Sequence, residues 1–338
     1  MTNFTRRGAL ALAAALAAGP ALAQDSEDLT EVSVGALRFT SHAPSFIAAE
    51  RGYFEDAGLD VSFEFFQAAQ PMAIAIASGD ADYGVTAITG GLISLAQKGA
   101  AKVIGGALSE EPGIDGQKIL ASTQAYEDGL TDPSQLDGRS WGVTQAGSSF
   151  HYMGSRIAEA EGAELTFRPL QKVPAVIGAL KTGQIDAWSI VPHIAKPLAG
   201  AGAVQVIGNV SDYLPNYQVT TLFTSTDTAE NEREQTEAFI EAFSRGAADF
   251  NAALVDKTAS DSEVDEIISI IAGYVYPDRP VEDARDAIVN GAMRVNLDGA
   301  LNEESVRDQL DWFKSEGLVD EGVTYETLVD DSYAGGNS

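Results

Sequence analysis

The chain contains no cysteine. This absence excludes disulfide bonds, thiolate metal sites, iron–sulfur clusters and cysteine nucleophiles. Basic residues are also scarce, because 21 Lys and Arg stand against 50 Asp and Glu and give a formal net charge of −29. Nucleic-acid phosphates and anionic lipid head groups would repel such a polyanion. We therefore expect neither nucleic acid nor a membrane surface as a partner.

Long uninterrupted apolar runs are missing as well. The most apolar internal segment, Pro71–Leu95, is interrupted by Asp80 and Asp82, so it does not qualify as a transmembrane helix. The chain has 338 residues with 45% hydrophobic residues, 33 Gly and 12 Pro, which is a globular composition. A chain of this length usually forms two domains, since a single hydrophobic core stops growing below it.

The first 23 residues carry no acidic side chain. They combine Arg6-Arg7, an apolar stretch and the A-x-A sequence Ala21–Ala23, a pattern typical of a cleaved export signal. The twin-arginine and the general secretory routes both fit this segment. Cleavage after residue 23 would leave 19 basic and 50 acidic residues, a net charge of −31. Without a cysteine to carry a lipid anchor, the exported chain is expected to diffuse freely in a periplasm.

From Glu31 onward, short β-branched runs alternate with helical patterns, which indicates βαβ units and a mostly parallel sheet. The alternation occurs in two series, and a helical remainder follows. The expected strands are 32–37, 61–65, 83–85, 102–108, 118–122, 140–144, 165–169, 185–189, 204–207 and 218–224. The expected helices are 44–57, 71–78, 91–97, 149–161, 173–182, 192–199, 229–254, 263–272, 281–292 and 302–315.

Two such series predict an α/β protein with two doubly wound lobes, joined by a hinge of two crossovers and completed by a helical C-terminal tail. The first lobe is expected to comprise 30–111 plus 226–338, and the second 112–225. Open α/β sheets bind ligands at the carboxyl ends of their strands. The strand-to-helix loops of both lobes should therefore face one shared cleft.

Four segments of the chain form a distinctive series. They are Ala43–Val61, the paired Gly-x-x-Asp sequences at Gly79–Asp82 and Gly183–Asp186, Leu136–Val143 with Gly147-Ser148-Ser149, and Phe313–Asp320 with Leu328–Tyr333. In their order and spacing they resemble a known family, the periplasmic solute-binding proteins of ABC importers for sulfonates, taurine, nitrate and thiamine-pyrimidine precursors. The likeness extends over residues 31–333.

The resemblance implies two lobes of the type II periplasmic-binding-protein kind. It also implies hinge closure on a small molecule, delivery to an inner-membrane permease, and neither catalysis nor a cofactor. A monomer is expected. The preferred ligand is a sulfonate or small aromatic carboxylate, followed by a pyrimidine or thiamine precursor and then by nitrate-like anions.

Ser148 and Ser149 lie between an expected strand and the helix that begins near position 149. Either serine can cap that helix, whose free N–H groups then attract an anion. The simpler interpretation is a helix cap with no ligand. The resemblance favours ligand contact, because sulfonate-type members of the family place the anion at the matching serines.

The three histidines, His42, His151 and His193, all follow expected strands. They could hydrogen-bond a ligand, form a three-histidine metal site, or be ordinary polar loop residues. Further candidates lie in the strand-end loops. The polar contacts expected there are Ser41, Gln67, Thr86 and Thr89, and the flat aromatic walls are Trp188 and Tyr217. We expect no Arg or Lys in the strand-end loops that form the site, which argues against a multiply charged anion.

Two acidic residues near the first crossover, Glu110 and Glu111, permit an alternative. They could bind an amine-bearing solute, although a solvated hinge loop explains them more simply.

An enzyme of the same fold is a second alternative, since one branch of the family makes the thiamine pyrimidine. That branch carries a cysteine-rich motif that this chain lacks. A periplasmic sensor that signals through its closed form is a third.

Overall fold

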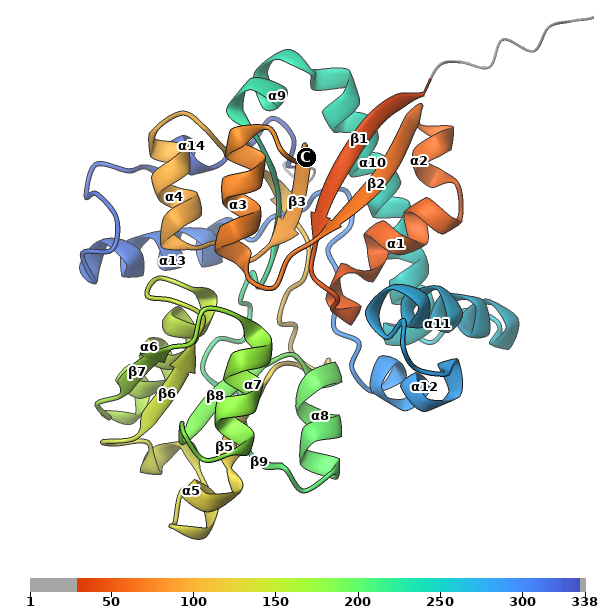
Figure 1. Cartoon of the computed structure of the whole chain (residues 1–338). Coiled ribbons are helices and arrows are strands. Elements are labelled where there is room, and N and C mark those ends of the chain that lie inside the picture. The colour runs from red at the N-terminus through yellow and green to blue at the C-terminus, as the bar shows by residue number, and fades with distance from the viewer. Residues whose placement is uncertain (1–28, 335–338) are drawn as a thin grey trace, which may run out of the picture.

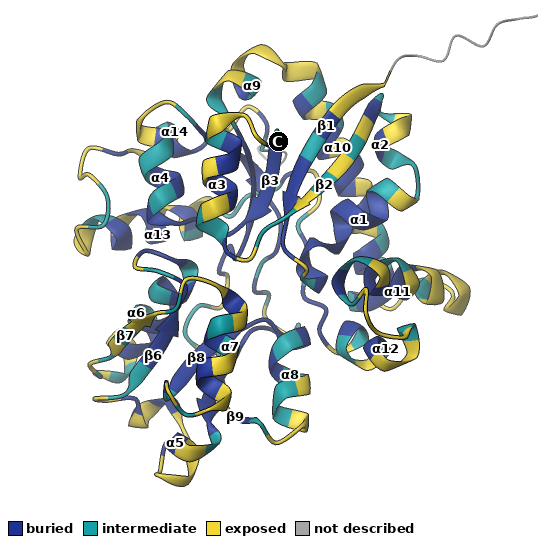
Figure 2. Cartoon of the chain, in the orientation of Figure 1, coloured by how far each residue is buried: buried dark blue, intermediate teal, exposed yellow. Residues whose placement is uncertain are grey.

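The computed structural model describes residues 29–334 and contains two lobes, each built on its own five-stranded sheet (Figure 1). The predicted signal peptide, 1–23, lies outside the described residues. Central strands and inward helix faces are buried, whereas the outer faces of the helices and much of the edge strands 59–65 and 166–169 are exposed or half-buried (Figure 2). No helix in the described part of the chain is long and apolar enough to span a membrane.

The first sheet has the order β2-β1-β3-β10-β4. Its strands β1, β2 and β3 are parallel, whereas β10 runs antiparallel to both neighbours. The strands are β1 (Thr30–Ala36), β2 (Leu59–Phe65), β3 (Tyr83–Thr86), β4 (Lys102–Gly106) and β10 (Thr221–Thr224). The helices of this part are α1 (Ala43–Glu50), α2 (Tyr53–Asp56), α3 (Ala69–Ser78) and α4 (Gly90–Gln97), with the short 3-10 helix η1 (Thr40–His42) before α1.

The second sheet repeats this arrangement with the order β7-β6-β8-β5-β9, and here β5 is the antiparallel strand. Its strands are β5 (Lys118–Ser122), β6 (Ser140–Val143), β7 (Thr166–Pro169), β8 (Ala187–Ile190) and β9 (Val204–Asn209). Its helices are α5 (Thr123–Glu127), α6 (Ser149–Glu161), α7 (Val173–Lys181) and α8 (Pro192–Gly200).

The C-terminal part returns to the first lobe as a series of helices, as the sequence predicts. They are α9 (Thr226–Asn231), α10 (Arg233–Phe250), a π-helical turn (Asn251–Val255), α11 (Asp261–Val275), α12 (Val281–Val289), α13 (Glu303–Ser315) and α14 (Tyr325–Leu328). The expected boundary at residue 225 needs correction, because β10 pairs with β3 and β4 of the first sheet. The second crossover therefore ends before Thr221.

The two Gly-x-x-Asp sequences form the same local structure in the two lobes. Gly79 and Gly183 adopt left-handed φ angles of 77° and 69° after α3 and α7, which glycine tolerates best. The carboxylate of Asp82 accepts hydrogen bonds from the backbone N–H and the hydroxyl of Ser33, at 2.7 and 2.9 Å.

The carboxylate of Asp186 accepts the equivalent pair of hydrogen bonds from Ser140, both at 2.7 Å. In each lobe, a carboxylate thus ties the entry of one parallel strand, β3 or β8, to a neighbouring parallel strand. The repeat detected in the sequence is therefore a repeat in structure.

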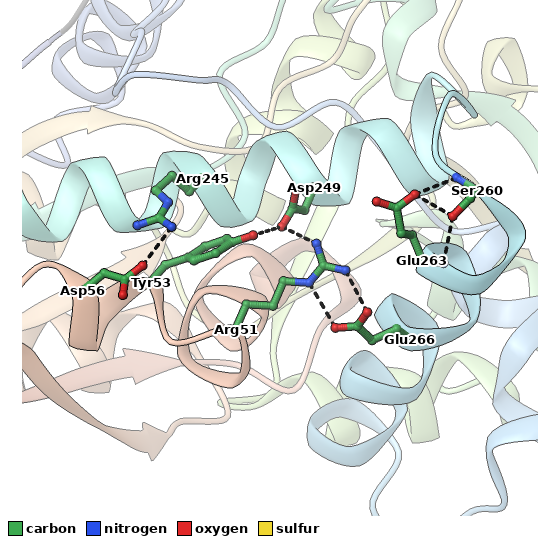
Figure 3. Close-up of polar contacts among 8 residues, drawn as sticks. All are labelled: Arg51, Tyr53, Asp56, Arg245, Asp249, Ser260, Glu263 and Glu266. Atoms are coloured by element: carbon green, nitrogen blue, oxygen red, sulfur yellow. Dashed lines mark hydrogen bonds and ion pairs between the residues drawn. The ribbon is translucent and has the colours of Figure 1, made fainter.

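The expected helix 44–57 is split in two, because Gly52 adopts a φ of 70° between α1 and α2. Arg51, next to this break, joins α1 to two C-terminal helices (Figure 3). Its guanidinium contacts Asp249 of α10 at 2.7 Å and Glu266 of α11 at 3.0 Å. Tyr53 donates a hydrogen bond to the same Asp249 at 2.6 Å. These contacts fix the C-terminal helices against the first lobe.

Candidate ligand-binding site

A cavity lies between the two lobes and is lined by residues of both, at a domain interface where small-molecule sites commonly occur. The carboxyl ends of parallel strands from both sheets contribute to it, as expected for open α/β sheets. Its lining combines aliphatic and phenyl groups with hydroxyl, amide and imidazole groups. None of the described residues that line it is Asp, Glu, Lys or Arg.

The first lobe contributes Ser41, His42 and Thr86, which follow β1 and end β3. Burial lowers the pKa of His42 to about 3, so its ring is neutral near pH 7. The backbone N–H of Leu37 donates to Nδ1 of His42 at 3.4 Å, which leaves Nε2 as the protonated nitrogen. This ring therefore offers a hydrogen-bond donor without a charge.

The second lobe contributes Ser148 and Ser149 at the N-terminus of α6. Ser148 is the N-cap residue, yet its hydroxyl makes no capping hydrogen bond. Its Oγ is buried and has no hydrogen-bond partner among the described residues. Because the first N–H groups of a helix lack intrahelical partners, this end of the cavity offers donors and a positive dipole end.

Three polar residues of the cavity lie outside the set of candidates predicted from the sequence, namely Thr144, which directly follows β6, and two residues that precede strands. Gln117 directly precedes β5 and Thr220 directly precedes β10, and both residues line the cavity. These strands are antiparallel to their neighbours, so their first residues lie at the cleft edge. Gln117 is buried, and its Nε2 has no partner among the residues described.

The two lobes touch each other beside the cavity. The backbone N–H of Gly90 donates to the carbonyl of Gly147 at 2.9 Å, and that of Val173 donates to the carbonyl of Gln67 at 3.2 Å. Each hydrogen bond joins the first residue of a helix in one lobe, α4 or α7, to a loop of the other lobe. They are consistent with a closed arrangement of the lobes.

Two predicted contacts, Thr89 and His151, have structural partners instead and lie outside the cavity lining. Thr89 caps α4, since its Oγ1 accepts the N–H of Leu92 at 3.1 Å. His151 accepts the N–H of Gly147 on Nδ1 at 3.1 Å and packs against the rings of Phe167 and Trp312.

Three further candidates, Trp188, His193 and Tyr217, are buried beside the cavity rather than lining it. Trp188 packs against Phe150 with ring centroids 5.1 Å apart. His193 packs against Phe39 at 5.3 Å, and burial lowers its pKa to about 3. All three have polar side-chain atoms without a partner among the described residues.

The three-histidine metal site is not assembled in the described part of the chain. His42 and His193 pack on the same ring, that of Phe39, whereas His151 packs against Phe167 and Trp312. No group of three His, Cys, Asp or Glu residues with metal-binding geometry occurs among the described residues.

The interpretation of Glu110 and Glu111 as a solvated hinge loop is wrong for Glu110. Its side chain is 2% exposed, and the N–H of Gln117 donates to Oε1 at 2.9 Å. Burial raises the pKa of this carboxyl to about 7. Glu111 instead forms an ion pair with Arg294 at 2.9 Å.

The model of the NMT1/THI5-like family matches residues 39–253 of the chain. The chain belongs to this family. No curated protein sequence matches this NMT1/THI5-like protein. Solved structures show its fold, which is that of periplasmic binding proteins.

The alkanesulfonate-binding protein SsuA from Xanthomonas axonopodis pv. citri, bound to MOPS, superposes with a TM-score of 0.69 at 16% identity, covering 89% of this chain and 98% of SsuA. The periplasmic nitrate-binding protein NrtA from Synechocystis PCC 6803 has a TM-score of 0.67 and 13% sequence identity. The match covers 89% of this chain and 84% of NrtA. The desulfurization enzyme DSZB has a TM-score of 0.59 and 14% sequence identity, and the match covers 89% of this chain and 96% of DSZB. The fold is thus shared by binding proteins and by an enzyme.

Proposed function

We propose that this protein is the periplasmic solute-binding component of an ABC importer. In this proposal it captures a small organic acid between its lobes, with a sulfonate or small aromatic carboxylate preferred, and delivers it to an inner-membrane permease. The observation that carries the proposal is the cavity that both lobes enclose, with interlobe hydrogen bonds beside it. A ligand that contacts both lobes stabilises such a closed form relative to an open one.

The lining of the inner cavity supports one acidic group on a partly apolar body. The N-terminus of α6 and the free hydroxyl of Ser148 offer donors at one end. Ala68 and Ala69 bring the N-terminus of α3 to the same cavity from the other lobe. Helix N-termini favour an anion by about 0.3–1 kcal/mol each, and by more when they are partly buried. The apolar walls suit a hydrocarbon body.

A pyrimidine or thiamine precursor is a second candidate ligand, and Gln117 favours it. The free amide N–H of this residue would pair with a ring nitrogen, while the amide oxygen would accept from an exocyclic amine. The proposal includes no catalysis. The solved structures of this fold include an enzyme, so catalysis is the remaining alternative. If the reaction depends on a coloured cofactor, absorption spectra of the purified protein would reveal it.

Ligand binding can be tested with 4-toluenesulfonate, benzoate and 4-amino-5-hydroxymethyl-2-methylpyrimidine. We expect at least one of the two acids to raise the Tm and to lower the radius of gyration measured by small-angle X-ray scattering, because closure compacts the molecule. Binding of the pyrimidine alone would favour the second candidate. If none of the three probes changes either quantity, the proposed function is overturned.

The anion end of the cavity is tested by the double variant Ser148→Ala/Ser149→Ala. We expect it to weaken binding of the acid identified above by about tenfold or more, because hydrogen bonds to a charged group are lost. Ser155→Ala, on the same helix but away from the cavity, is the matched control. Equal affinity of the wild type and the double variant would show that the acid is held elsewhere.

A further inference from the structure

A second hollow between the lobes adjoins the inner cavity. Leu37, Phe39 and Val173 line both the inner cavity and this outer groove. The two hollows are therefore neighbours. Unlike the inner cavity, the groove is lined by charged residues, namely Arg38, Arg279 and Asp278.

The two arginines lie on the first lobe, in the loops after β1 and after α11. The Arg38 guanidinium stacks 3.8 Å above the ring of Phe65, which also lines the groove, and one of its N–H groups donates to the carbonyl of Tyr274. Arg279 lies 5.4 Å from the ring of Tyr276. A guanidinium has five N–H donors, so most of those on Arg38 stay available.

Most arginines of this acidic protein are ion-paired. Seven of the eleven arginines among residues 29–334 form ion pairs with Asp or Glu. Arg38 and Arg279 are among the four that form none within that part of the chain. Both line the same groove, where a chain with a net charge of −29 would otherwise repel an anion.

The opposite wall of the groove belongs to the second lobe and is apolar. It consists of Val173, Pro174, Ile177 and Ile194. No carboxylate of the second lobe thus lines the groove to neutralise the arginines. Asp278 is the one acidic residue among the described lining residues.

We propose that the outer groove is a second part of the ligand site and that Arg38 and Arg279 bind a second acidic group there. The preferred solute is then an elongated organic diacid, with one acidic group in the inner cavity, an apolar body along Leu37, Phe39 and Val173, and the other acidic group on the arginines. Arginine suits this role because its planar fork pairs with carboxylate and sulfonate oxygens. This inference rests on the proposed function.

The test compares ligands that differ in the second acidic group. Calorimetric titration at 0.15 M salt would use 4-toluenesulfonate, 4-sulfobenzoate and the longer 3-(4-sulfophenyl)propanoate. The first two have similar shapes, and the third carries its carboxylate farther out. We expect at least one of the two diacids to bind about tenfold more tightly than 4-toluenesulfonate, the gain expected from a charge-assisted hydrogen bond.

The double variant Arg38→Gln/Arg279→Gln should abolish this preference for the diacid. Arg245→Gln/Arg285→Gln is the matched control, because it removes the same charge from two ion-paired arginines outside the groove. The control should retain the preference. Asp278→Asn should increase it, since a repelling carboxylate is removed.

The outcomes separate the inference from the proposed function. If 4-toluenesulfonate binds but neither diacid binds more tightly, the outer site is overturned and the proposed function stands. The outer site is also overturned if Arg38→Gln/Arg279→Gln still binds a diacid more tightly than 4-toluenesulfonate. If none of the three titrated acids binds, and benzoate and the pyrimidine do not bind either, both the outer site and the proposed function are overturned.

Discussion

The two lobes share a framework but differ in what surrounds it. Both sheets place a parallel three-stranded unit beside one antiparallel strand, and both tie a strand entry to a serine through Asp82 or Asp186. The first lobe also carries the C-terminal helices, held through Arg51. The duplicated sheet therefore provides a common scaffold, while chemistry and added stability come from segments outside it.

The lobes also contribute different groups to the cleft. The second lobe supplies the N-terminus of α6, the free hydroxyl of Ser148 and an apolar wall. The first lobe supplies His42, Thr86 and the arginines of the outer groove. A ligand that needs both sets binds well only when the lobes meet, which makes closure depend on the ligand.

The largest effect is expected at the helical layer found in the first lobe. Gly246 lies on α10 where it crosses α1, and a Cβ there would be 2.2 Å from the carbonyl oxygen of Pro44. Gly246→Ala should therefore force the helices apart and lower the free energy of unfolding by about 3 kcal/mol. Urea denaturation followed by circular dichroism measures this loss.

Gly273→Ala is the control for that experiment. Gly273 lies on α11, and a Cβ there would meet no atom within 4 Å. We expect this variant to gain up to about 1 kcal/mol from helix propensity. Unchanged stability of Gly246→Ala would contradict the view that close packing of α1 on α10 supports the first lobe.

A smaller effect tests the shared framework. Asp82→Ala and Asp186→Ala each remove a carboxylate that accepts hydrogen bonds from a backbone N–H and a hydroxyl. We expect each to lower the free energy of unfolding by about 2 kcal/mol, since those donors lose their partner. Denaturation of the two variants side by side would show equal losses. A large loss in one and none in the other would end the equivalence of the lobes.

The smallest effect is a pH dependence to which each lobe contributes one histidine. Burial lowers the pKa of His42 and of His193 from 6.5 to about 3. Below pH 6.5 the unfolded chain therefore binds protons that the folded chain does not, and stability falls. Each histidine should cost about 1 kcal/mol on going from pH 7 to pH 5.5, less than the loss of either aspartate.

His42→Gln and His193→Gln should each remove that part of the pH dependence. Urea denaturation of each variant and of the wild type at both pH values measures it. His151→Gln should remove less, because this ring is half-buried. Equal pH dependence in the wild type and both variants would show that the two rings are accessible to protons in the folded protein.

Much of the fold could be predicted from the sequence. Alternating β-branched and amphipathic runs gave two α/β series, and the paired Gly-x-x-Asp sequences indicated their equivalence. The helix break at Gly52 and the pairing of β10 in the first sheet were missed. Periodicity marks a strand, but the neighbour that the strand pairs with depends on contacts distant in sequence.

The candidate site was predicted in part. Ser41, His42, Thr86, Ser148 and Ser149 line the inner cavity, and Gln67 lines the outer groove. Gln117 was missed because it precedes a strand. An antiparallel strand points its amino end, not its carboxyl end, at the cleft. Arg38 was missed as well, although it lies in the loop after β1.

The order of residues along the chain by itself determined the two α/β series, the helical tail and the loops that end the parallel strands, because these depend on local propensity and hydrophobic spacing. Tertiary structure decided which polar groups stay unpaired in the cavity and which arginines stay free of carboxylates. Those outcomes depend on distances between segments from separate parts of the chain, and pairing changes with a few ångströms of separation.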